Sequence, residues 1–171
     1  MKRLVLMMGV SGAGKSAYIK QMAPILFGAH DYKYVSRDEI RFKLLEEAGE
    51  KEYFGVENKV WGKWVHKIKT GLEDYGTVIA DATHLTKGSR LKLIKTLDVK
   101  PEEIWVIWVD VPLATCLAQN AQREGLARVP EEVIRNMYDG LEPPHYKEGK
   151  VVYDKIWIKH PNSIETLKEE E

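Results

Sequence analysis

The stretch that decides the fold is Lys2 to Ser16, KRLVLMMGVSGAGKS, in which an apolar run breaks into glycines and ends in Lys-Ser. It contains the pattern G-x-x-x-x-G-K-[ST], which binds phosphates when a strand feeds the loop and a helix leaves it. The apolar residues predict that strand, and a helical pattern starts near Lys15. The sequence therefore predicts a phosphate-binding loop at this point of the chain.

The residue types of this loop suit a nucleoside triphosphate. Its glycines let backbone N–H groups approach a phosphate closely, and the helix start favours the same anion. Lys15 is placed to reach the β and γ phosphates, and Ser16 offers a hydroxyl to Mg²⁺. ATP or another triphosphate, with Mg²⁺, is the predicted cofactor set; the alternative is a glycine-rich turn that only matches the pattern. The predicted nucleotide contacts are Gly9, Ser11, Gly12, Ala13, Gly14, Lys15, Ser16 and Ala17.

Length and composition narrow the class of protein. A chain of 171 residues predicts one domain, residues 1 to 171, with a substantial core. Lys and Arg balance Asp and Glu at 26 each, so no overall positive field attracts nucleic acid, although a local basic cleft is compatible with it. Cys116 is the only cysteine, which argues against a disulfide framework or a cysteine zinc site and fits a reducing compartment. No apolar run reaches membrane length, so we expect a cytoplasmic protein without a membrane partner and leave homo-oligomerisation open.

Short β-rich runs alternate with helical patterns, which predicts a three-layer α/β fold with a five-stranded parallel sheet and helices on both faces. The predicted strands are residues 3–8, 33–36, 77–81, 103–109 and 152–158. The predicted helices are residues 15–23, 38–48, 56–75, 87–97, 112–122 and 130–141, the first of which is stopped by Pro24. Ligands of such sheets lie beyond the carboxyl ends of the strands, so the residues that follow each strand are the candidate site.

The segment SRDEIR, residues 36 to 41, follows the second predicted strand. A carboxylate at Asp38 suits a base that accepts the proton of an attacking hydroxyl in phosphoryl transfer. Arg41 lies three residues on, on the same helix face, and its planar guanidinium suits a phosphate on the acceptor. The alternative is an ordinary helix start, since Ser36 and Glu39 also fit a capping box.

The third predicted strand ends in DATHL, residues 81 to 85. Asp81 is placed to hold Mg²⁺ or its waters, or else to cap the loop, and Thr83 to donate to an acceptor phosphate. His84 is not predicted to be a metal ligand, because no second His or Cys stands at ligand spacing.

A polar interruption at residues 120 to 130 carries Arg123 and Arg128 on either side of Gly125. Arginines on a hinged segment above a phosphate-binding loop predict a lid that brings positive charge to the transferring phosphoryl group and excludes water. An ordinary solvated connection between two helices is the alternative.

Five motifs together resemble the P-loop polynucleotide 5′-hydroxyl kinase family, represented by the kinase domain of bacteriophage T4 polynucleotide kinase. They are GVSGAGKS, SRDEIR, DATHL followed by SRL, WVDVP and RVPEEVIRNMY, in the family's order over residues 3 to 142. The resemblance implies a P-loop kinase fold with Asp38 as general base and Arg41 and Thr83 on the acceptor's 3′ phosphate. It also implies that Val129 packs on the acceptor base and that Arg123 or Arg128 contacts the nucleotide phosphates. The candidate metal ligands are Ser16, Asp38 and Asp81.

The resemblance implies an ATP-dependent kinase of the 5′-hydroxyl ends of DNA or RNA. Its catalytic residues would be Lys15, Asp38, Arg123 and Arg128, with nucleic acid 5′ ends as partners. The phage enzyme continues into a 3′-phosphatase domain, whereas no D-x-D-G-T-like motif occurs in this sequence, so no phosphatase activity is expected. Two alternatives stay open, a small-molecule kinase of the same fold and a nucleotide-binding switch without an acceptor.

Overall fold

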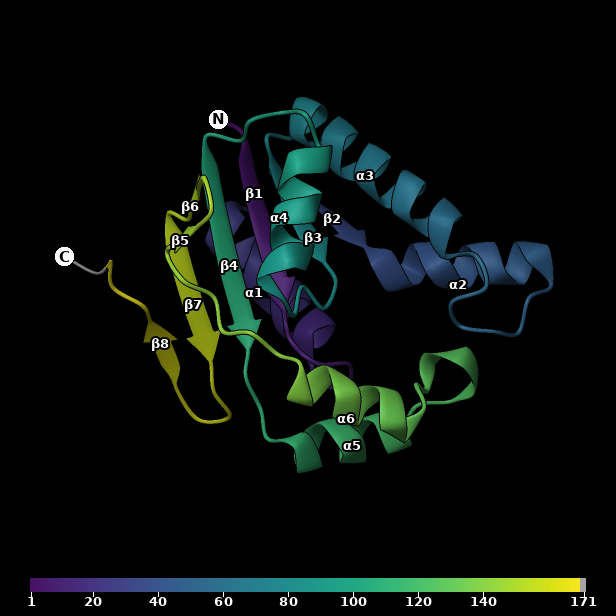
Figure 1. The fold of residues 1–171 in the computed structure, drawn as a ribbon. Coiled ribbons are helices and arrows are strands. Elements are labelled where there is room, and N and C mark those ends of the chain that lie inside the picture. The colour runs from purple at the N-terminus through teal and green to yellow at the C-terminus, as the bar shows by residue number, and fades with distance from the viewer. Residues whose placement is uncertain (170–171) are drawn as a thin grey trace.

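A parallel sheet carries the predicted phosphate-binding loop at its centre. The computed structural model describes residues 1–169, and four strands lie where the sequence predicts them. These are β1 (Arg3–Met8), β2 (Tyr32–Ser36), β3 (Thr77–Asp81) and β4 (Glu103–Val109). These strands lie in the order β2-β3-β1-β4, so β1 has one parallel neighbour on each side, β3 and β4 (Figure 1). The loop after β1 therefore opens at the middle of the sheet's carboxyl edge.

The last part of the sheet differs from the prediction of a single strand over residues 152–158. A two-stranded antiparallel hairpin, β5 (Lys147–Glu148) with β6 (Val151–Val152), precedes β7 (Lys155–Lys159), which pairs in parallel with β4. Between this hairpin and β7, Tyr153 is fully buried and its hydroxyl donates to Glu148 of β5. A sixth strand, β8 (Ile164–Thr166), pairs antiparallel with β7, so the prediction of five strands, all parallel, is wrong at this edge.

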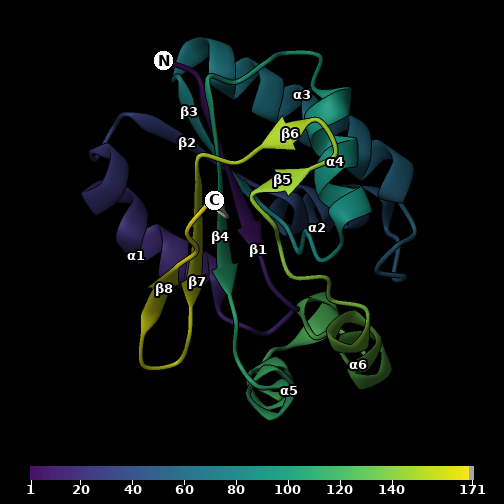
Figure 2. The same ribbon diagram turned by 60° about the vertical axis from the view of Figure 1, so that its left-hand side comes forward.

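Helices cover both faces of the sheet, as predicted, and two of them lie beyond its carboxyl edge. Figure 2 shows α1 on one side of the strands and α3 with α4 on the other. In Figure 1, α5 and α6 lie beyond the strand ends. The bounds are α1 Lys15–Phe27, α2 Arg37–Ala48, α3 Glu57–Asp74, α4 Lys87–Thr96, α5 Leu113–Ala121 and α6 Glu131–Asp139, with a 3-10 turn, η1, at Gly125–Ala127.

Helix α1 continues through Pro24 to Phe27, so the prediction that it ends before Pro24 is wrong. A proline removes one hydrogen bond from a helix, but the extra turn buries Phe27 against Trp105, with ring centroids 5.3 Å apart. Apolar burial outweighs the local penalty here, as tertiary packing often overrides propensity.

The strands β1, β2, β3, β4 and β7 contribute alternate side chains to two apolar layers. One layer packs against α2, α3 and α4 and includes Trp64 and Ile68, both fully buried. The other packs against α1, α5 and α6 and includes Cys116. In the described part of the chain, no helix is both long enough and apolar enough to cross a membrane.

Candidate active site

The loop after β1 has the geometry of a phosphate cradle. Gly9, Gly12 and Gly14 have φ values of 155°, 87° and 93°, which glycine tolerates best. A Cβ on Gly12 would lie 2.4 Å from the backbone carbonyl oxygen of Cys116, so the loop packs directly on the backbone of α5. Gly14 is the N-cap of α1 and has no side chain to cap the helix, so the first-turn N–H groups are left for an anion.

Four side chains on the donor side of the site come from α1, from the middle of β2 and from the end of β3. Ser16 Oγ donates to Asp81 Oδ2 over 2.6 Å, and the Tyr34 hydroxyl donates to the same oxygen. Lys15 Nζ donates to the carbonyl of Val10 over 3.2 Å. Burial lowers the pKa of Lys15, and the negative charges of Asp81 and Asp38 oppose that effect. A triphosphate bound in the loop would add further negative charge and keep this ammonium protonated.

The donor set fits Mg²⁺. Ser16 and Asp81 present hard oxygen atoms within hydrogen-bond distance of each other, and Asp81 accepts both hydroxyls at Oδ2, which leaves Oδ1 for a metal or its water. Within residues 1–169, no three His, Cys, Asp or Glu side chains are grouped to hold a metal ion. Mg²⁺ in phosphoryl transfer takes one or two protein ligands and completes its shell with phosphate oxygens and water, so Ser16 and Asp81 would be enough to hold it.

Asp38 is presented by the first turn of α2. The N-cap Ser36 accepts a hydrogen bond from the backbone N–H of Glu39 over 3.2 Å, so one half of the predicted capping box forms. The Glu39 carboxylate does not complete the box and instead contacts Lys20 at 3.4 Å. With its helix start fixed in this way, Asp38 lines the cleft and its side chain stays 47 % exposed.

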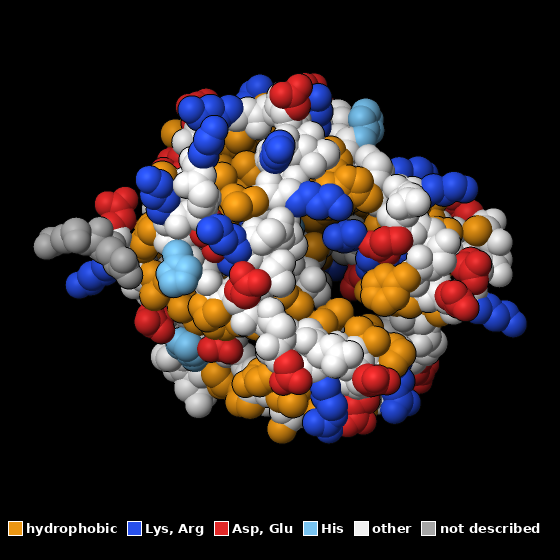
Figure 3. Space-filling view, viewed as in Figure 1, with side chains coloured by type: hydrophobic (Ala, Val, Ile, Leu, Met, Phe, Trp, Pro, Cys, Tyr) orange, Lys and Arg blue, Asp and Glu red, His pale blue; other side chains and the backbone are white. Residues whose placement is uncertain are grey.

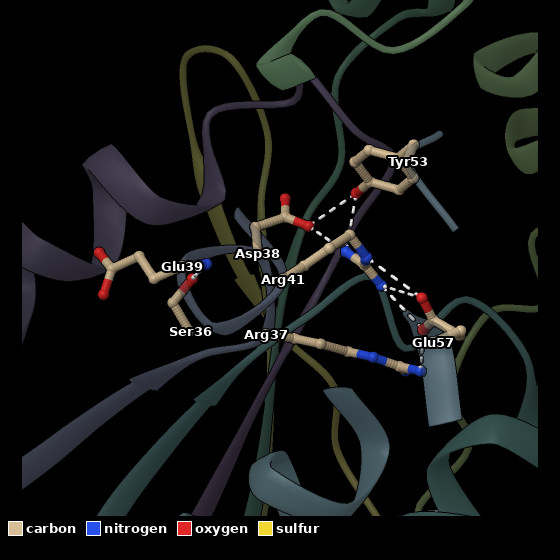
Figure 4. Close-up of polar contacts among 7 residues, drawn as sticks. All are labelled: Ser36, Arg37, Asp38, Glu39, Arg41, Tyr53 and Glu57. Atoms are coloured by element: carbon tan, nitrogen blue, oxygen red, sulfur yellow. Dashed lines mark hydrogen bonds and ion pairs between the residues drawn. The ribbon is translucent and has the colours of Figure 1, made fainter. Parts of the chain in front are cut away.

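The Asp38 carboxylate is held through one oxygen. Oδ1 accepts from the Tyr53 hydroxyl over 2.6 Å and from Arg41 Nη1 (Figure 4). Burial and the charge of Asp38 raise the pKa of Tyr53, so this hydroxyl remains a donor at neutral pH. Both of these hydrogen bonds go to Oδ1, and neither goes to the other carboxylate oxygen, Oδ2.

Arg41, which the sequence predicts to bind the acceptor's phosphate, is buried and fully engaged by protein groups in this structure. Its Nε and Nη2 donate to the Glu57 carboxylate over 2.9–3.2 Å, and its Nη1 donates to Asp38 and, over 2.9 Å, to Tyr53. Arg37 Nη2 donates to the same Glu57 over 2.6 Å (Figure 4). Glu57 thus occupies an oxyanion site between two arginines, and Arg41 orients Asp38.

The loop after β3 places Thr83 on the cleft wall and turns His84 into the core. His84 has a φ of 45°, and its Nδ1 lies 2.7 Å from the carbonyl oxygen of Met7. Burial lowers its pKa to about 4, so the ring is neutral at pH 7. The Thr83 carbonyl accepts from Gly9 N–H over 2.9 Å and so joins this loop to the phosphate-binding loop.

A buried ion pair between Arg90 and Glu148 packs against the loop after β3. Arg90 and Glu148 expose 0 % and 1 % of their side chains and form two hydrogen bonds of 2.8 and 2.6 Å. Arg90 also donates to the carbonyls of His84 and Glu142, and Tyr153 donates to Glu148. Burial alone would raise the pKa of Glu148, but the bonds from Arg90 and Tyr153 outweigh it and lower that pKa.

The segment between α5 and α6 contributes Arg123 to the cleft but not Arg128 or Val129. Arg123 lines the cleft with Lys15, whereas Arg128 lines a separate hollow beside α5. Val129 is 97 % buried because the side-chain amide of Asn120 pairs with its backbone, donating over 2.7 Å to its carbonyl and accepting over 3.0 Å from its N–H. The structure therefore does not bring Val129 to the acceptor side, and of the two lid arginines it brings only Arg123 to the cleft.

The cleft that joins these groups has a volume of about 190 Å³. The sequence-predicted residues that line it are Ser11, Lys15, Ser16, Asp38, Arg41, Asp81, Thr83 and Arg123. Ala13 is buried and its N–H bonds to Val10, while Ala17 is exposed outside the cleft. Figure 3 shows the hollow on this face, with blue, red and orange side chains on its rim.

Sequence reasoning missed five residues of the site: Tyr34, Tyr53, Phe54, Glu57 and Met137. Tyr53, Phe54 and Glu57 lie outside the strand-end positions that topology selects, in the connection between α2 and α3 and at the first residue of α3. Arg37 directly follows the second predicted strand, so the strand-end rule selects it as a candidate, although the sequence assigned it no role.

A family model described as an AAA domain matches residues 4–144. The chain belongs to this family. A curated relative, the L-seryl-tRNA(Sec) kinase of Methanococcus maripaludis, is 27 % identical over 147 residues, which are 84 % of this chain. The match covers 54 % of that protein, so the chain spans about half the length of this relative.

Solved structures of low sequence identity share the fold. Kti12 of Chaetomium thermophilum, solved with ADP-AlF3, superposes with a TM-score of 0.69 at 14 % identity, over 93 % of this chain and 89 % of that one. A chain of the Pnkp1/Rnl/Hen1 RNA repair complex gives a TM-score of 0.64 at 18 % identity, over 89 % and 51 %. A sugar kinase of Janibacter sp. HTCC2649 gives 0.61 at 17 % identity, over 94 % and 86 %. The predicted P-loop kinase-like fold is therefore confirmed.

Proposed function

We propose that this protein is an ATP- and Mg²⁺-dependent kinase that phosphorylates the 5′-hydroxyl ends of DNA or RNA. The observation that carries the proposal is one cleft with two chemically distinct sides. Lys15, Ser16 and Asp81 form a donor side suited to a triphosphate, and Asp38 with its free Oδ2 faces the same space. A nucleotide switch without an acceptor has no use for a carboxylate positioned in this way.

In the proposed reaction, the Asp38 carboxylate accepts the proton of the acceptor hydroxyl as its oxygen bonds to the γ-phosphorus. The bond from that phosphorus to the β–γ bridging oxygen breaks, and ADP leaves with the electron pair. Lys15 and the loop N–H groups stabilise the charge on the phosphates, and Arg123 adds positive charge from the lid. Mg²⁺ held by Ser16 and Asp81 would neutralise the β and γ oxygens.

The oxyanion site between Arg37 and Arg41 supports an acceptor that carries a phosphate. In the structure the Glu57 carboxylate takes this place, with three hydrogen bonds from Arg41 and one from Arg37. A phosphate has the same bidentate geometry toward a guanidinium, so the acceptor's 3′ phosphate would replace Glu57 there, next to Thr83. The names of two similar proteins describe work on RNA, a seryl-tRNA kinase and an RNA repair complex.

The direct test is transfer of label from γ-labelled ATP to a 5′-hydroxyl oligonucleotide of DNA and of RNA. We expect labelled 5′ ends with the wild-type protein and almost none with Asp38→Asn, while both proteins bind ATP equally. Exposed Glu39 lies next to Asp38, so Glu39→Gln is the matched control and should keep full activity. If the wild-type protein labels neither oligonucleotide but labels a nucleoside or sugar, the proposal fails.

A small-molecule kinase is the second candidate, and the engagement of Arg41 favours it. Every donor group of this guanidinium already has a protein partner, which an acceptor without a phosphate would leave undisturbed. The two candidates differ in their preference for nucleoside 3′-phosphate over plain nucleoside. A polynucleotide kinase should strongly prefer nucleoside 3′-phosphate, and Arg41→Ala should abolish that preference. The readout is the ratio of kcat/KM for the two acceptors, because loss of Arg41 also loosens Asp38 and so lowers the activity with both.

A further inference from the structure

Phe54 is an exposed aromatic side chain that lines the active-site cleft. It exposes 53 % of its surface, although a large apolar ring gains about 1.5 to 3 kcal/mol on full burial. Among the exposed large hydrophobic side chains of residues 1–169, it is the one that lines the active-site cleft. Met137 of α6 lines the same cleft, so the cleft has apolar contacts available as well as charged ones.

The Phe54 ring is held in a defined orientation. The Tyr53 ring meets it edge to face, with centroids 4.6 Å apart and planes at 86°. The Arg41 guanidinium lies 4.4 Å from the Tyr53 centroid and 5.7 Å from that of Phe54, which anchors both rings by cation–π contact. Arg41 is itself held by hydrogen bonds to Glu57, so the two rings pack against a guanidinium whose position is fixed.

Tyr53 connects this pair to the chemistry. Its hydroxyl donates to Asp38 over 2.6 Å. Tyr53 therefore both contacts the Phe54 ring and orients Asp38, the proposed general base. In a nucleoside, the 5′-hydroxyl and the base are attached to one ribose. A nucleoside whose hydroxyl reaches Asp38 would therefore place its base among the side chains around Asp38, of which Tyr53 and Phe54 are the aromatic ones that line the cleft.

We propose that Phe54, backed by Tyr53, is the platform on which the base of the acceptor's 5′-terminal nucleoside stacks. This inference rests on the proposed function and names the residue that recognises the acceptor base in place of Val129, which is buried. All four bases have a π face, so such a platform binds without sequence preference. Because stacking acts on the base and not on the reacting atoms, it contributes to acceptor binding.

The test compares two acceptors that differ only in the base. One is a 5′-hydroxyl oligonucleotide, and the other is the same oligonucleotide with an abasic 5′-terminal residue. We expect Phe54→Ala to lower kcat/KM for the complete acceptor about tenfold, mostly through KM, and to leave kcat/KM for the abasic acceptor unchanged. Phe54→Trp should retain the preference for the base. Tyr75→Ala is the matched control, because Tyr75 is 48 % exposed but lies outside the cleft.

The outcomes separate this inference from the proposed function. If the wild-type protein phosphorylates both oligonucleotides and Phe54→Ala lowers both equally, or neither, the platform is wrong and the kinase assignment stands. If the wild-type protein phosphorylates no oligonucleotide at all, the proposed function fails and the platform fails with it. Unchanged ATP affinity and melting temperature in Phe54→Ala establish that the fold is intact in either case.

Discussion

Acidification should destabilise this protein through His84. The ring is buried, its Nδ1 is within 2.7 Å of the Met7 carbonyl oxygen, and burial with the positive charges of Arg37, Arg90 and Lys15 lowers its pKa to about 4. In the unfolded chain this pKa returns to its ordinary value of 6.5. Between these two values the unfolded state binds a proton that the folded state does not.

The sign and size of the effect follow from that difference. The stability due to neutral His84 is complete above pH 6.5, falls as the pH drops, and is lost once the pH is below about 4. Each pH unit in that window corresponds to about 1.4 kcal/mol, so the free energy of unfolding should fall by about 3 kcal/mol in total. That is a large part of the 5 to 15 kcal/mol that holds a typical domain folded.

Chemical denaturation at half-unit steps from pH 7.5 to pH 4 measures this slope. The control is His84→Asn, because Asn tolerates a positive φ and does not titrate in this range. The variant will be less stable at pH 7, but its stability should depend less on pH by up to the same 3 kcal/mol. Equal slopes for the two proteins would show that His84 is not the group responsible and would refute the reasoning.

Three further variants test the catalytic base, the phosphate cradle and the buried ion pair. Asp38→Asn should lower phosphoryl transfer about 10²- to 10⁴-fold and leave ATP binding unchanged; transfer at the wild-type rate would exclude Asp38 as the base. Gly12→Ala puts a Cβ 2.4 Å from a carbonyl oxygen of α5 at a φ of 87°, so ATP affinity measured by titration should collapse, and an unaffected Kd would contradict the cradle. Glu148→Gln leaves Arg90 buried and uncompensated, which should cost about 3 to 5 kcal/mol in urea denaturation. The exposed-pair control Glu131→Gln should cost less than about 1 kcal/mol, and equal losses would contradict this reading of the buried pair.

The donor side could be predicted from the sequence because its signals are local. The loop motif, its strand and its helix lie within a few residues of one another, and the strands β1, β3 and β4 have the predicted bounds. The position of Asp38 and Asp81 at one edge follows from parallel strand topology alone. Patterns of this kind need no knowledge of distant contacts.

The acceptor side could be predicted only in part because distant contacts decide it. Glu57 neutralises Arg41 from another helix, and Asn120 draws Val129 into the core from nine residues away. The same holds for α1, where burial of Phe27 carries the helix past Pro24. In each case a tertiary partner that no local pattern encodes decides the surroundings of the residue.

The pairing of Asn120 with the backbone of Val129 has a mechanical consequence. The two hydrogen bonds join the ends of the segment between Asn120 and Val129, so the intervening residues form a closed loop. Gly12 packs closely on α5 near Asn120, so the joined ends of this closed loop lie beside the phosphate-binding loop. Arg123 therefore lies on a closed segment whose two ends are held together, and we expect any movement of its side chain toward the loop to arise within residues 121 to 128.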